Sequence, residues 1–226
     1  MIAQAIGQTL AFGAAVALSP APIILVVLML SGGRGLGAAA AFLAGWALGL
    51  AALGAAVLLF ASAEGASEAQ GPAKWVGALK AVLGLALLVV AVKQWSARST
   101  DDVEPELPAW AGKVDSFGPA KAAGTAILFA AVKPKNLVLT IGASAAIAES
   151  GASTAAQAIA LAVFVLVASA GLLVPLGIYV LAGERAATIL GDLRAWMTRE
   201  TSTIVAVICL LFGVKLIGDA IGILAR

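Results

Sequence analysis

The feature that most constrains the fold is a series of long stretches without charge. Residues 154–182, for example, contain no Asp, Glu, Lys or Arg. An apolar stretch of about 20 residues spans the hydrocarbon core of a bilayer as a helix. The whole chain is 62% hydrophobic and 12% charged, whereas soluble domains are roughly 45–50% apolar and about 25% charged. We therefore expect an all-α integral membrane protein, and a net charge of +2 is too small to indicate nucleic-acid binding.

The apolar stretches predict six transmembrane helices, at about residues 2–30, 35–61, 72–95, 119–148, 153–182 and 202–224. They lack the alternation expected of strands and are rich in Ala and Leu. The first stretch has no positive region before it and is too long for a signal peptide, so we expect it to be retained. The domain organisation predicted is a first three-helix unit at 1–96, a cytoplasmic linker at 97–118 and a second unit at 119–226.

The distribution of Lys and Arg predicts the topology. The connections after the first, third and fifth spans carry most of the basic residues: Arg34, Lys93, Arg98, Lys113, Lys121, Arg185, Arg194 and Arg199. The opposite side carries Lys74 and Arg226 near the span ends. Basic loops stay in the cytoplasm, so we expect a multi-pass protein with both termini extracytoplasmic.

Two cytoplasmic connections have amphipathic patterns. In residues 107–117 and 183–200, apolar side chains recur at spacings of three and four, with charged residues between them. This pattern is typical of short helices that lie in the membrane interface. The alternative for each segment is a solvated loop with scattered apolar residues.

An internal comparison suggests a duplicated architecture. When Pro20 is placed over Pro134, Ser19 lies over Lys133 and Pro22 over Asn136. Two consecutive copies with three spans each face opposite ways, so the prediction is two inverted three-helix repeats. Helices broken by proline at matching positions of two halves mark the binding site of many transporters.

The prolines predict where the first and fourth spans are broken. A proline inside a helix removes one donor and displaces the carbonyl four residues before it. Pro20 is thus expected to free the carbonyl of Val16, and Pro134 that of Ala130. In lipid such groups need new partners, so the broken segments should face protein or a wet cavity. The alternative is that these prolines are tolerated kinks.

The stretch AVKPKN places two lysines at the second break, Lys133 and Lys135. A charge at the bilayer centre costs about 2.5–3.5 kcal/mol on insertion scales, which makes it a candidate functional group. Donors from both breaks, without a carboxylate nearby in sequence, suit an anionic or zwitterionic head group. The predicted substrate-binding residues are Ser19, Pro20, Pro22, Lys133, Pro134, Lys135 and Asn136.

The other charges within spans leave alternatives open. A central lysine is also tolerated when it is neutral or paired with a carboxylate from another span. Asp219 is the main candidate, but Lys215, four residues before it, is its expected partner. Lys80 is expected to extend its ammonium to the outer interface. Gly45 and Gly49 have the spacing that permits close helix packing or formation of a homo-oligomer.

The motifs LSPAPIILVV and VKPKNLVL resemble the paired motifs of the LysE superfamily of small membrane exporters. The chain is most similar to its GAP branch, the Sap-like, peptidoglycolipid-addressing proteins. The family pattern more often has Asn-Pro-Lys at the second motif, where this chain has Lys133. The resemblance covers the whole chain and implies export or lipid handling at the plasma membrane, with membrane lipids as partners.

Three classes of function are compatible with a membrane protein of this size. The first is a secondary transporter that exports a small anionic or zwitterionic metabolite or a lipid bearing such a head group. The second, an enzyme, would need a nucleophile, a base or metal ligands, and the sequence has no His and a single Cys. We therefore expect no enzyme, no metal and no cofactor. The third is a non-transporting accessory protein of a glycolipid export machinery.

Overall fold

The structure is a computed structural model that describes residues 2–32, 35–63, 74–97 and 117–225. All its regular elements are helices: α1 Ile2–Ala17, α2 Pro20–Ser31, α3 Gly35–Ala63, α4 Lys74–Ser96, α5 Pro119–Ala131, α6 Pro134–Glu149, α7 Thr154–Leu181, the 3-10 turn η2 Gly183–Arg185, and α8 Ala186–Leu224. The interfacial helix predicted at 107–117 lies, except for Phe117, outside the described residues.

The helices are long and apolar enough for a membrane protein. Four of them, α3, α4, α7 and α8, each contain a candidate span. The pairs α1–α2 and α5–α6 also qualify when each bent pair is taken as one span, which gives between four and six crossings among the described residues. The prediction of an all-helical multi-pass membrane protein is confirmed.

The first and fourth predicted spans are both interrupted at their prolines. The axis bends by 55° between α1 and α2 and by 66° between α5 and α6. The second helix of each pair begins with proline, at Pro20 and Pro134. Proline is well tolerated at the first position of a helix, because its missing N–H has no partner there in any case.

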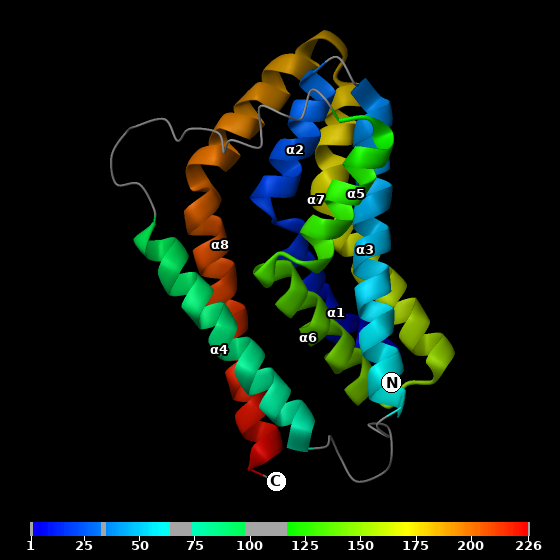
Figure 1. Ribbon diagram of the computed structural model, residues 1–226, viewed down its shortest axis with the longest axis vertical. Coiled ribbons are helices and arrows are strands. Elements are labelled where there is room, and N and C mark those ends of the chain that lie inside the picture. The colour runs from blue at the N-terminus through cyan, green and yellow to red at the C-terminus, as the bar shows by residue number, and fades with distance from the viewer. Residues whose placement is uncertain (1, 33–34, 64–73, 98–116, 226) are drawn as a thin grey trace.

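Successive helices run up and down the molecule (Figure 1). α1 begins and α8 ends at the same end, where α3 also ends, α4 begins and the chain passes from α6 to α7. At the opposite end α2 ends, α3 begins and the chain passes from α7 to α8. The two broken pairs lie within the bundle, so their interruptions fall near the middle of its height.

Close helix packing relies on glycine at several crossings. α3 packs along α5, α7 along α1, and α4 along α8. A Cβ atom on Gly45 would collide with the backbone of Ala123 in α5, and one on Gly171 would collide with the carbonyl oxygen of Ala17 at the end of α1. The spacing of Gly45 and Gly49 therefore serves packing inside the chain, because both glycines face α5.

The last helix corrects one predicted boundary. Residues 183–200 were expected to form a separate interfacial segment before a span at 202–224, but α8 runs without a break from Ala186 to Leu224. Thr198 and Thr201 help to explain this continuity, since each hydroxyl donates to the carbonyl four residues earlier. Such bonds satisfy the hydroxyls within the helix, which they often bend without ending it.

Candidate functional site

The first break is built around Ser19. α1 ends at Ala17 and α2 begins at Pro20, while Ser19 has the extended backbone angles φ −102° and ψ 103°. The residue before a proline is disfavoured in the helical region by a clash with the proline ring. Ser19, Pro20 and Pro22 are all buried, whereas Leu18 beside them is exposed, so the polar residue of this interruption lies within the protein.

The second break repeats this arrangement with Lys133 in the place of Ser19. Its backbone is also extended, with φ −61° and ψ 124°, and Pro134 begins α6. In contrast to the first break, Lys133 and Pro134 are exposed. The next two residues, Lys135 and Asn136, are buried at 8% and 2% exposure.

Ser19 and Asn136 join the two breaks directly. The Ser19 hydroxyl lies 2.6 Å from the carbonyl oxygen of Val16 and 3.0 Å from Oδ1 of Asn136. The amide nitrogen of Asn136 donates to the carbonyl of Phe129 over 3.1 Å. Val16 is the residue whose carbonyl Pro20 was predicted to free. At the second break the amide of Asn136 bonds to the carbonyl of Phe129, the residue before Ala130, whose carbonyl Pro134 was predicted to free.

Lys135 forms a second connection between the breaks. Its ammonium donates to the carbonyl oxygen of Ala15 over 2.8 Å, from α6 to the last turn of α1. The last carbonyls of a helix lack partners within it and carry the negative end of its dipole. The end of α1 therefore offers a buried cation a favourable position.

Lys133 has different surroundings although it is two residues away. Its side chain is exposed, and its ammonium lies 4.4 Å from the centre of the Phe129 ring. Among the described residues, neither Lys133 nor Lys135 has a carboxylate within ion-pair distance. The second break therefore carries two basic groups that no described acidic side chain neutralises.

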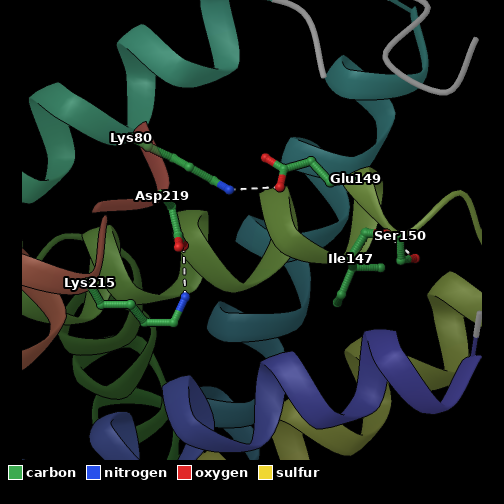
Figure 2. A network of polar contacts seen from close by, with 6 residues as sticks. All are labelled: Lys80, Ile147, Glu149, Ser150, Lys215 and Asp219. Carbon is green, nitrogen blue, oxygen red and sulfur yellow. Dashed lines mark hydrogen bonds and ion pairs between the residues drawn. The ribbon is translucent and has the colours of Figure 1, made fainter. Parts of the chain in front are cut away.

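The two ion pairs found in the described part of the chain lie elsewhere, between α4, α6 and α8 (Figure 2). Lys80 bonds to Glu149 and Lys215 to Asp219, each over 2.7 Å. The predicted pairing of Lys215 with Asp219 is confirmed. The prediction for Lys80 was wrong: its side chain is 5% exposed and points to Glu149 on α6, because this partly buried carboxylate lies within ion-pair distance of the ammonium.

Sequence reasoning missed three polar residues of α6. Glu149 is the last residue of that helix and holds Lys80, whereas the fourth span was predicted to end one residue earlier. Thr140 and Ser144 follow Asn136 at intervals of four residues and are fully buried, and their hydroxyls have no hydrogen-bond partner among the described residues. The four-residue spacing of Asn, Thr and Ser in the sequence was the signal for this polar face.

The described residues contain no cluster of three or more His, Cys, Asp or Glu side chains that would hold a metal ion. What the second break offers a ligand is the exposed ammonium of Lys133, because Lys135, Ser19 and Asn136 are buried and already donate to protein groups. An ammonium of this kind suits recognition of oxygen-rich anionic groups.

Comparisons with known proteins bear on the family alone. Searches of curated proteins and of solved structures found no match. The family model of Sap, sulfolipid-1-addressing protein, matches residues 9–222, a range that includes both breaks and both ion pairs. The predicted likeness to Sap-like proteins is thereby confirmed, and the chain belongs to the Sap, sulfolipid-1-addressing protein family.

Proposed function

We propose that this protein is a secondary transporter that exports an anionic lipid, or a small anionic or zwitterionic molecule with a similar head group. The observation that carries the proposal is the pair of broken spans, joined by Ser19, Asn136 and Lys135 and carrying unneutralised positive charge. The family description names a sulfolipid, and a sulfated or sulfonated head group is an anion of the kind this site suits.

The proposed mechanism rests on two inverted three-helix repeats that rock against each other. In this repeat α1 corresponds to α5, α2 to α6, α3 to α7 and α4 to α8. Each contact between two helices should therefore have a counterpart between the corresponding helices. The α3–α5 contact has its counterpart in α7–α1, the α3–α6 contact in α7–α2, and the α2–α8 contact in α6–α4, and all six contacts occur. The α3–α7 and α4–α8 contacts map onto themselves. This pattern supports the repeat, and transporters so built bind substrate at the repeat interface.

The two lysines take different roles in this proposal. Lys135 holds the break in shape, because its ammonium is already bonded to the carbonyl of Ala15. Lys133 receives the anion, since its exposed ammonium contacts a ring face and donates no hydrogen bond to a described residue. Ser19 and Asn136 fix the distance between the repeats.

The proposed setting is the plasma membrane with both termini outside. At the end of the molecule where the chain passes from α7 to α8, the turn η2 and the first part of α8 contain Arg185, Arg194 and Arg199. By the positive-inside rule this end faces the cytoplasm. The exposed Lys133 side chain then lies between the two faces of the membrane.

Transport by the purified protein is the direct test. We would place a fluorescent sulfated glycolipid in the inner leaflet of liposomes that contain the protein, and follow its arrival in the outer leaflet by quenching. Lys133→Met should abolish this movement without lowering thermal stability, because it removes a charge that is costly in the membrane. Lys133→Arg should restore it in part, since a planar guanidinium replaces a compact ammonium poorly.

Lys121 provides a matched control. Its ammonium also lies over an aromatic ring of its own segment, 4.5 Å from the centre of Phe117, but at the opposite end of α5. Lys121→Met should leave transport unchanged. Equal activity of Lys133→Met and the unaltered protein would refute the role of Lys133.

The alternative is an accessory protein that presents the lipid to a larger export machinery. The word "addressing" in the family description favours this function. It predicts that the purified protein binds the sulfated lipid in a Lys133-dependent manner but does not move it between leaflets. Binding without movement would therefore replace the transporter proposal with this one.

A further inference from the structure

An apolar pocket lies away from the breaks, between α3, α4 and α6. Its volume is about 430 Å³. Nine of its ten lining residues are apolar, and the tenth is Glu149. Ala56 and Phe60 of α3, which belong to its lining, are exposed on the surface of the helix bundle. The pocket is thus accessible from the side, where the hydrocarbon of a membrane surrounds the protein.

Glu149 has one carboxylate oxygen in use and one without a partner. Oε2 accepts from the ammonium of Lys80, as Figure 2 shows, while Oε1 is buried and accepts from no described donor. A buried oxygen of this kind is costly unless a donor reaches it. Because Lys80 already neutralises the carboxylate, the missing partner is a neutral donor, such as a hydroxyl group, and a second cation is not required.

We propose that this pocket binds one acyl chain of a membrane lipid whose head group carries hydroxyl groups, with one hydroxyl donating to Oε1 of Glu149. The apolar lining matches a hydrocarbon chain, and the volume lies toward the low end of ligand pockets, which are roughly 300–1,000 Å³. A single chain therefore fits better than a whole lipid. The site shares no residue with the two breaks, so it does not depend on transport through them.

Photolabelling of the full-length protein in lipid nanodiscs tests this site. The probe is a palmitoyl monoacylglycerol with a diazirine near the end of its chain. Peptide mapping should place the label on pocket residues such as Val57, Leu79 or Ala145. A second probe, identical except that both head-group hydroxyls are methylated, should label these residues several times less, because it has no hydrogen to donate.

A matched pair of variants tests the position of the chain. Ala56→Phe places a ring in the opening of the pocket and should reduce labelling by about tenfold or more. Ala52→Phe is the control, since Ala52 is also exposed and lies one turn earlier on α3 but does not line the pocket. Both changes are at exposed positions, so both proteins should fold.

The role of Glu149 is tested by Lys80→Met combined with Glu149→Leu, which removes the acceptor without leaving a lone buried charge. This variant should label equally with both probes. The proposal is overturned if Ala56→Phe and Ala52→Phe label alike, if the label falls mainly outside the pocket, or if the unaltered protein shows no preference between the probes.

Discussion

At the scale of single residues, the contact between Ser19 and Asn136 is the most direct link between the two breaks. Both side chains are buried, and their oxygen atoms lie 3.0 Å apart. Residues that share one hydrogen-bond network show coupling of roughly 0.5–3 kcal/mol in double-mutant cycles. We expect Ser19→Ala and Asn136→Ala to be non-additive by about this amount in the free energy of unfolding, measured in mixed micelles.

Ser62 supplies the control cycle for that prediction. Its hydroxyl also bonds to a backbone carbonyl, that of Leu58, but it is exposed near the end of α3. Ser62→Ala and Asn136→Ala should therefore add. If the unfolding free-energy changes of Ser19→Ala and Asn136→Ala also add, the two breaks are not coupled through this contact.

The two central lysines show how far residue-level reasoning reaches. The sequence placed both lysines at the second break and identified the donors around them, and these identifications stay predictions of function. It did not distinguish their surroundings, because the direction of each side chain depends on the 66° bend after α5 and on the position of α1. Lys80 and Glu149 illustrate the same limit: no local pattern relates residues from different spans.

At the scale of helices, the crossing of α1 and α7 depends on Gly171. A methyl group there would collide with the carbonyl oxygen of Ala17. Gly171→Ala should therefore force the helices apart and lower the free energy of unfolding by about 1–3 kcal/mol, as overpacked sites do. Thermal unfolding in detergent would measure this loss.

Gly177 on the same helix is the matched control. No atom lies within 4 Å of a Cβ built on it. Gly177→Ala should be neutral or slightly stabilising, because alanine favours the helix more than glycine does. If both substitutions behave alike, the close approach of α1 to α7 is not a constraint on stability.

The two ion pairs differ in what they contribute to helix association. Lys80 and Glu149 connect α4 to α6 and are 5% and 20% exposed, whereas Lys215 and Asp219 lie on one helix and are 42% and 37% exposed. Glu149→Gln leaves a buried lysine without its partner and should cost about 3 kcal/mol. Asp219→Asn should cost under about 1 kcal/mol, because both side chains of this pair are exposed. Denaturant unfolding of the two variants would measure both losses of unfolding free energy. Because the two ion pairs have equal distances in the unaltered protein, similar losses would contradict this view.

The sequence predicted the helices better than their continuity. Uninterrupted apolar stretches indicated the long helices α3 and α7, and Pro20 and Pro134 indicated both breaks. α8 was divided wrongly because its first part is amphipathic and its second part apolar, so the two parts have different patterns. Nothing in residues 197–203 forces a helix to end, and the two threonine hydroxyls bond back to the helix itself.

At the scale of the whole molecule, the up-and-down path of the chain predicts which surfaces face the same side. Ala97 directly follows the end of α4, and Gly191 lies near the start of α8. Single cysteines at these two positions should react with a membrane-impermeant reagent only from the cytoplasm. A cysteine at Ser62 should react only from outside. All three positions are exposed. The native Cys209 is buried, and the variants would be made in a Cys209→Ser background so that only the introduced cysteine reacts. Labelling of Ser62→Cys and Gly191→Cys from one side would contradict this topology and the inverted repeat with it.

In the proposed transporter, the two lysines at the second break, which no described carboxylate neutralises, would also make the transport cycle sensitive to membrane voltage. Both belong to the second half of the chain, because the equivalent positions in the first half are Ser19 and Ala21. Moving one elementary charge through the full membrane potential is worth about 2.3 kcal/mol per 100 mV. A negative interior therefore draws the empty site toward the cytoplasm, while a bound anion cancels part of that pull. Binding of the anionic substrate would in this way allow the site to open to the outside. After the substrate dissociates, the membrane potential would favour the inward-facing state of the empty site.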